Sequence, residues 1–181
     1  MASTFSIEAQ PDTDIWKKAP AHDVFNAPYK PLSTNPLPKF LSASITFSAL
    51  YTTQFDQAGI LLKFTRPSSP STPRKWIKAG IELFNGAPAS PPVAGASHAE
   101  EIKSGARPVT ILVEKSESGS CLWVYQVDGD EKVPLREICW PFAENGGEGW
   151  ELEVSAAVAR PNKEVDGVLQ AQFHDFDIKW A

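Results

Sequence analysis

The apolar residues of this chain alternate with polar ones in short runs, and this two-residue period restricts the fold more than any other feature. No segment of about 11 residues or more shows the 3.6-residue apolar period of an amphipathic helix. Proline, glycine, serine and asparagine separate the runs, and the 16 prolines cluster between them, where strands end. The chain is therefore predicted to be almost entirely β-structure.

Short strands follow one another along the chain without helices between them. Asp128-Gly129 is a strong signal for a tight hairpin turn, and the stretch up to Pro38 is otherwise irregular. This arrangement favours a sandwich or barrel over an α/β fold. The strands that we expect are Phe5–Ala9, Val24–Asn26, Phe40–Tyr51, Phe55–Phe64, Lys75–Phe84, Val109–Lys115, Cys121–Val127, Val133–Trp140, Trp150–Ala159 and Val168–Trp180.

Size and charge limit the class of protein. The 181 residues suit one domain, and 42% hydrophobic residues can fill a sizeable core. A net charge of -5 with no block of Lys and Arg argues against nucleic acid or an anionic membrane as a partner. The N-terminus lacks the regions of a secretory signal, and no apolar run reaches the roughly 18 residues that span a bilayer. We therefore expect a cytoplasmic protein formed by a single domain over residues 1–181.

Two neighbouring strands carry a mixed set of side chains on their outer faces. Alternation along KWIKAGIELF directs Ile77, Ala79, Ile81 and Leu83 to the core. Along FDQAGILLKF it directs Ala58, Ile60, Leu62 and Phe64 inward. The opposite faces carry a tryptophan, charged and amide groups and bare backbone. A tryptophan beside glycines offers a stacking platform, and the polar groups offer hydrogen bonds to a sugar. The residues of this outer set are Gln57, Gly59, Trp76, Lys78, Gly80 and Glu82.

Structural roles for the same residues stay open. Lys78 and Glu82 lie on one strand and could belong to a ladder of ion pairs with the next strand. The long loop 85–107, rich in Pro, Ala and Ser, could cover Trp76. Either arrangement would leave the outer face without a binding role.

The cysteines and histidines give weak signals for metal. Cys121 and Cys139 are too few for a zinc cluster, and their apolar surroundings favour two buried free thiols, with a cross-strand bridge as the alternative. His174 and Phe176 are expected on one face of the last strand. Asp128-Gly129-Asp130 lacks the remaining ligands of a calcium loop. No metal and no cofactor are therefore predicted.

Two motifs together resemble the family catalogued as domain of unknown function 1349. FDQAGILL and WIKAGIELFNG are similar to its paired signature, and TDIWKKAP, VFNAP and FHDFDI are similar to its ends, so the resemblance runs from Asp14 to Ile178. It implies the antiparallel two-sheet jelly-roll β-sandwich of the concanavalin A-like lectin/glucanase superfamily, but no settled chemistry. The signature positions here are Asp56, Gln57, Gly59, Trp76, Lys78, Gly80, Glu82 and Asp175.

The favoured function is binding of a glycan or another small polar molecule on the concave sheet face. The ligand-binding candidates are Asp56, Gln57, Trp76, Lys78 and Glu82. The alternative is an enzyme, either a glycoside hydrolase or a small-molecule isomerase or cyclase. Glu82 would then act as acid or base and Lys78 would tune its charge. Binding is preferred because the chain lacks the acid cluster that glucanases of this fold carry on one strand. A third possibility is a protein that binds partners through exposed sheet edges.

The carboxylates offer few catalytic pairs. Hydrolysis of a glycoside uses two carboxyl groups about 5 to 9.5 Å apart. Glu151 and Glu153 share a strand face, and solvated acids explain them well. We expect Glu82 with Asp56 or Asp175 across strands to be a better pair.

Overall fold

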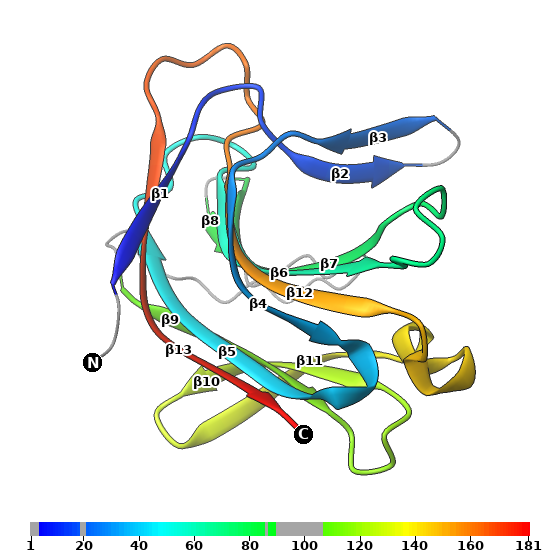
Figure 1. The fold of residues 1–181 in the computed structure, drawn as a ribbon. Coiled ribbons are helices and arrows are strands. Elements are labelled where there is room, and N and C mark those ends of the chain that lie inside the picture. The colour runs from blue at the N-terminus through cyan, green and yellow to red at the C-terminus, as the bar shows by residue number, and fades with distance from the viewer. Residues whose placement is uncertain (1–3, 19–20, 86, 90–106) are drawn as a thin grey trace.

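Two antiparallel sheets packed face to face form the body of the protein, as the computed structural model shows (Figure 1). The structure describes residues 4–18, 21–85, 87–89 and 107–181. Loop 85–107 lies almost wholly outside these residues, and so does the expectation that it covers the outer face. The six-stranded sheet contains, from edge to edge, β1 (Phe5–Ala9), β13 (Leu169–Trp180), β5 (Phe40–Ala49), β9 (Val109–Lys115), β10 (Leu122–Asp128) and β11 (Glu131–Ile138).

The second sheet has five strands and curves so that its concave side faces away from the six-stranded sheet (Figure 1). A two-stranded ribbon lies over this concave side. The five strands, in spatial order, are β4 (Tyr29–Pro36), β12 (Glu151–Ala159), β6 (Gln57–Thr65), β7 (Lys75–Phe84) and β8 (Ala87–Ala89), and the ribbon is β2 (Ile15–Lys18) with β3 (His22–Phe25).

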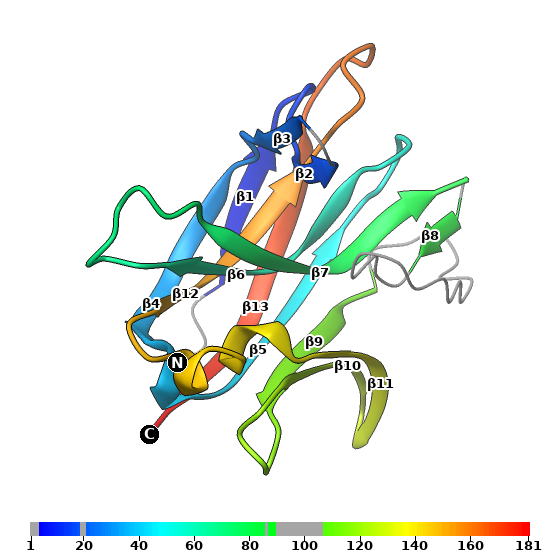
Figure 2. The same cartoon turned by 90° about the vertical axis from the view of Figure 1, so that its right-hand side faces the viewer.

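Short 3-10 turns close the end of the sandwich opposite the ribbon. Figure 2 shows η2 and η3 at this end, between the five-stranded sheet and the β10–β11 hairpin. The three turns are η1 (Leu37–Lys39), η2 (Trp140–Phe142) and η3 (Asn145–Gly147). No helix in the described part of the chain is long and apolar enough to cross a bilayer.

The core lies between the two sheets, where the inward side chains of both meet. Phe47 and Phe173 on the six-stranded sheet are fully buried, as are Ile60 and Phe64 on β6. The inward side chains predicted from alternation for the central strands are therefore confirmed. Burial of this kind stabilises by roughly 25 cal/mol for each Å² of apolar surface.

The predicted strands agree with the observed ones closely, except near the N-terminus. β1, β7 and β9 have the expected bounds, and the others differ by a few residues. The stretch expected to be irregular instead contains β2 and the eight-residue β4. β4 is an edge strand, and Pro31 and Pro36 are tolerated there because one side of an edge strand needs no hydrogen-bond donors.

A β-bulge in β13 breaks the expected alternation near its middle. Asp175 has a positive φ of 24°, and the pairing shifts between His174 and Phe176. His174 is therefore opposite Thr46 and Phe176 opposite Ile45, two neighbours on opposite faces of β5. The expectation that His174 and Phe176 share a face is wrong, because the bulge inserts one extra residue between them.

Candidate functional site

A pocket opens on the concave face of the five-stranded sheet, beneath the β2–β3 ribbon. About 340 Å³ of space there is free of protein atoms, and this volume includes open solvent at the mouth of the pocket. Apolar residues of β12 and the ribbon form one wall, and polar residues of β6 and β7 form the floor. The lining consists of Ile15, Ala27, Gln57, Ala58, Gly59, Lys78, Gly80, Ile81, Glu82, Ala157, Val158 and Ala159.

Two opposed glycines shape the floor of this pocket. Gly59 on β6 pairs with Gly80 on β7. A Cβ on Gly80 would lie 2.0 Å from the carbonyl oxygen of Ala58, and one on Gly59 would lie 2.1 Å from the carbonyl oxygen of Ala79. Both positions therefore require glycine for the strands to approach each other, and the bare backbone of the floor is a consequence of that approach.

Lys78 is held in the pocket by oxygen atoms of three residues, two of them neighbours in the ribbon segment. Its Nζ donates hydrogen bonds to the carbonyl of Ile15 at 3.0 Å and to Oε1 of Gln57, and it lies 3.7 Å from a carboxylate oxygen of Asp14. Three donors thus face three acceptors. Burial lowers the pKa of Lys78, against the opposing effect of Asp14 and Glu82.

The carboxylate of Glu82 has unused hydrogen-bonding capacity among the described residues. No hydrogen bond joins its carboxylate to another residue in the described ranges, although its neighbours are half-buried or buried. Burial raises the pKa of Glu82; Lys78 opposes this shift and Asp14 adds to it. A desolvated carboxylate with free lone pairs can accept hydrogen bonds from hydroxyl or amino groups of a ligand, or exchange a proton with it.

Gln57 links the pocket floor to the turn that precedes β6. Its side-chain amide accepts from Lys78 and donates to the carbonyl of Phe55 at 3.1 Å. The remaining N–H of the amide is the donor left for a ligand. Gln57, Lys78 and Glu82 thus meet in one pocket, with Asp14 behind Lys78.

Asp56 lies outside the pocket lining and has partners of its own. It is fully buried, and its Oδ1 lies 3.3 Å from Nε of Arg160. Its Oδ2 accepts hydrogen bonds from the backbone N–H groups of Thr52 and Thr53, each at 3.0 Å. This network fixes the turn that leads into Gln57, so Asp56 positions the site and does not face it.

Trp76 also lies outside the lining. It packs beside a second apolar cluster formed by Ile15, Ala27, Leu61, Ala157 and Ala159 under the ribbon. The indole is half-buried there, one pleat beyond Lys78. Trp76 and Glu82 thus share the outer face of β7, as alternation predicts, but the indole packs against this cluster and does not line the pocket.

The proposed carboxylate pairs are not formed. Asp56 is occupied by Arg160, and Asp175 is exposed on β13 of the other sheet. Glu153 forms an ion pair with Lys63 at 2.8 Å, and the Ser155 hydroxyl donates to it at 3.0 Å. The expected pairing of Glu82 with Asp56 or Asp175 is wrong, because strand order and the buried arginine keep these acids apart.

Asp14 and Ile15 contribute to the site, and analysis of the strand faces alone did not find them. The side chain of Asn26 accepts from the backbone N–H of Asp14 at 2.7 Å and donates to the carbonyl of Asp12 at 2.8 Å, which fastens the base of the ribbon. The TDIWKK motif, which contains both residues and resembles one end of the family, is the sequence signal that could have identified them. Among the described residues, the group of three metal-ligating side chains that the structure brings together lies elsewhere, at Cys121, Glu137 and Cys139.

Comparisons with known proteins agree with this architecture. A family model described as a protein of unknown function, DUF1349, matches residues 1–180. The uncharacterized protein AN7484 of Emericella nidulans is 34% identical over 169 residues, covering 90% of this chain and 80% of that protein.

Solved structures share the fold at low sequence identity. A functionally unknown protein of Saccharomyces cerevisiae superposes with a TM-score of 0.64 at 18% identity, covering 98% of this chain and 88% of that chain. The alginate lyase A1-II′ gives 0.52 at 8%, covering 99% and 80%. A Mycobacterium tuberculosis protein, described as an immunostimulatory antigen and pseudo β-1,3-glucanase, gives 0.51 at 12%, covering 83% and 66%. The expected concanavalin A-like jelly-roll sandwich is confirmed.

Proposed function

We propose that this chain, which belongs to the DUF1349 family of proteins of unknown function, binds a small carbohydrate in the pocket beneath the β2–β3 ribbon. Ligand pockets are mostly apolar hollows with a few convergent polar groups. This pocket has that composition, because Gln57, Lys78 and Glu82 lie among glycine, alanine, valine and isoleucine residues.

One observation carries the proposal: a partly desolvated carboxylate, with no hydrogen-bond partner among the described residues, lines the pocket beside Gln57 and Lys78. Burial raises the pKa of Glu82, and ionisable groups with shifted pKa values gather at functional sites. The three hydrogen-bond donors of Lys78 are already directed at oxygen atoms of the protein. Lys78 therefore positions Gln57 and supports the charge of Glu82, while Glu82 contacts the ligand.

The groups on offer define the ligand chemistry. Glu82 accepts hydrogen bonds, Gln57 has one free N–H, and the alanines of β12 present an apolar wall. A ligand with adjacent hydroxyls on one side and C–H groups on the other satisfies all three, and a sugar ring has this form. Two solved structures that share the fold are named for a polysaccharide lyase and a pseudo-glucanase, which supports testing carbohydrates first.

Glu82→Gln tests the proposal because it keeps the side-chain shape and removes the charge. Binding of the full-length chain to an array of mono- and disaccharides is followed by calorimetry with the sugars that bind. A hydrogen bond to a charged group contributes about 1.5–3 kcal/mol. We expect the variant to bind at least about tenfold more weakly, since 1.4 kcal/mol corresponds to a factor of ten.

Glu151→Gln is the matched control, because Glu151 is a partly exposed carboxylate on β12 outside the pocket lining. It should bind the sugar with unchanged affinity, and both variants should keep the wild-type circular dichroism. Equal affinity of Glu82→Gln and the wild-type chain would remove Glu82 from the binding site. An array on which no sugar binds the wild-type chain would overturn the carbohydrate proposal.

The raised pKa of Glu82 also supports a second candidate, an enzyme in which Glu82 is a general acid or base. Among the described residues, the pocket lining offers no second carboxylate beside Glu82, which makes this the weaker candidate. Incubation of each bound sugar with the wild-type chain distinguishes the two. Turnover that is lost in Glu82→Gln supports the enzyme, and unaltered sugar after prolonged incubation supports binding alone.

A further inference from the structure

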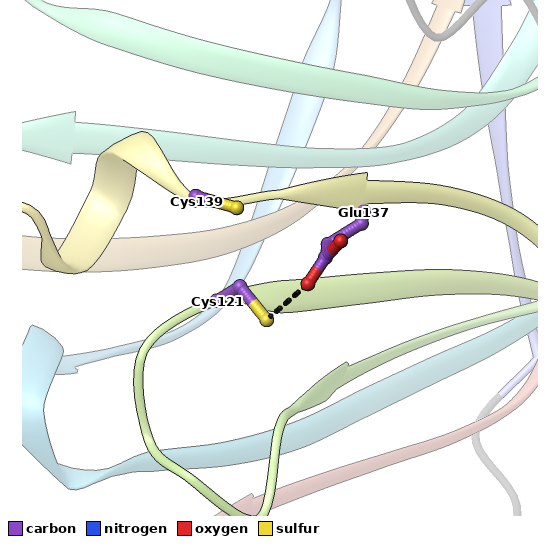
Figure 3. A group of neighbouring side chains, drawn as sticks. All are labelled: Cys121, Glu137 and Cys139. Carbon is purple, nitrogen blue, oxygen red and sulfur yellow. Dashed lines mark hydrogen bonds between the residues drawn. The ribbon is translucent and has the colours of Figure 1, made fainter.

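Three side chains that can bind a metal meet at the open end of the β10–β11 hairpin (Figure 3). One ligand atom from each of Cys121, Glu137 and Cys139 lies within 4.8 Å of the others. The Cys121 Sγ donates a hydrogen bond to Oε1 of Glu137 at 3.0 Å. Cys121 is buried, while Glu137 and Cys139 are exposed. The expectation of two buried thiols thus holds for Cys121 and is wrong for Cys139, which lies just past the end of β11.

The strand register explains why these side chains gather. Leu122 pairs with Ile138, and both are buried in the core. The residues one step further out on each strand, Cys121 and Cys139, therefore oppose each other and point away from the core. Glu137 lies two residues before Cys139 and so shares its face.

We propose that Cys121, Glu137 and Cys139 bind one zinc ion, with water as the fourth ligand. Tetrahedral zinc takes thiolate sulfur at about 2.3 Å, which places two sulfur ligands about 3.8 Å apart. The ligand atoms of the three residues lie up to 4.8 Å apart, so they need to approach one another by only about 1 Å. Two of the three side chains are exposed and free to rotate by that amount, and the exposed side leaves room for the water.

The donor set favours zinc over other ions. Thiolates select zinc, copper(I) and iron–sulfur clusters, whereas a carboxylate ligand suits zinc but not copper(I). Binding exchanges two thiol protons for one Zn²⁺, so two protons go to solvent and the occupied site carries one net negative charge. Zinc displaces the protons of both thiols, so its affinity should rise with pH.

Cobalt(II) replaces zinc in such sites and gives an optical signal for each bound thiolate. The chain has two cysteines, so sulfur-to-cobalt charge-transfer absorption in the reduced, metal-free protein can come only from these residues. We expect this band to saturate at one Co²⁺ per monomer, together with the visible bands of tetrahedral cobalt, and to vanish when Zn²⁺ is added. Cys139→Ser, an exposed change that spares the fold, should lose about half of the band or more.

Glu137→Gln should keep both thiolate bands but weaken zinc affinity by more than the roughly tenfold typical of losing an outer-shell partner. Glu131→Gln is the matched control, since Glu131 is an exposed acid at the other end of β11. It should match the wild-type chain in both measurements. Three results would overturn the site: no charge-transfer band at equimolar cobalt, a band of full strength in Cys139→Ser, or one ion shared between two chains.

Discussion

Lys78 and Glu82 lie two pleats apart on β7, and burial shifts the pKa of each toward the neutral form of its side chain. The two charges partly compensate each other, with Asp14 as a third member. Burying these two charged groups therefore costs folding free energy. Apolar residues at the same positions would avoid this cost. Such a cost is common at binding and catalytic sites, where the free ligand-facing group is needed.

The cost at Glu82 predicts a specific pH dependence of stability. Because the folded state raises the pKa of Glu82, it holds this proton to higher pH than the unfolded chain, whose glutamates titrate near about 4.3. The free energy of unfolding therefore falls as pH rises through the window between the two values. Glu82→Gln lacks this loss, so it should be more stable than the wild-type chain at pH 7 and equally stable below about pH 4.

Urea unfolding of both chains across this pH range measures the difference directly. Glu151→Gln again serves as the control and should show no comparable change with pH. A difference between wild-type and Glu82→Gln chains that does not change with pH would show that Glu82 is not desolvated in the folded state.

At the scale of elements, pairing of β6 with β7 depends on the two opposed glycines. Gly59 and Gly80 allow an approach that leaves no space for a methyl group against the facing backbone. The pocket floor, the position of Lys78 and the register of Gln57 opposite Glu82 all depend on this contact.

Gly80→Ala should therefore destabilise the protein by about 3 kcal/mol or more, because the new Cβ meets backbone that cannot rotate away. Gly167→Ala is the comparison: its φ is +79°, but a Cβ there meets no atom within 4 Å. Its cost should be about 1–2 kcal/mol from the backbone conformation alone. Denaturant midpoints measure both, and equal losses in the two variants would contradict the close approach.

Much of the fold and part of the site could be predicted from alternation. The inward faces of β6 and β7 and the shared outer face of Gln57, Lys78 and Glu82 follow from a two-residue period. Only part of the ribbon, the short strand Val24–Asn26, is predicted from the sequence. Its contact with the pocket is not, because Asp14 reaches Lys78 across a sequence separation that no local pattern encodes. Ile15 of the same ribbon belongs to the apolar cluster beside which Trp76 is half-buried, so the indole expected to stack on a sugar packs against protein.

At the scale of the whole molecule, the sandwich carries two separate groups of residues that could bind a ligand or a metal ion. The ribbon-covered pocket lies on the concave side of the five-stranded sheet, and the cysteine cluster lies at the end of the six-stranded one (Figures 1 and 3). A further hollow beside Trp140 and Trp150 lies near η2, with Lys75 and Glu144 at its rim. A binding signal alone therefore does not show which of these places holds the ligand, and the binding site must be mapped as well.

Amide chemical-shift mapping by NMR during titration with a bound sugar locates the ligand most directly. The account predicts shifts confined to the backbone of the pocket, at residues 57–59, 78–82 and 157–159, with the ribbon around Ile15 moving as well. Shifts that gather around Trp140 and Trp150 while the amides of Lys78 and Glu82 stay in place would contradict it.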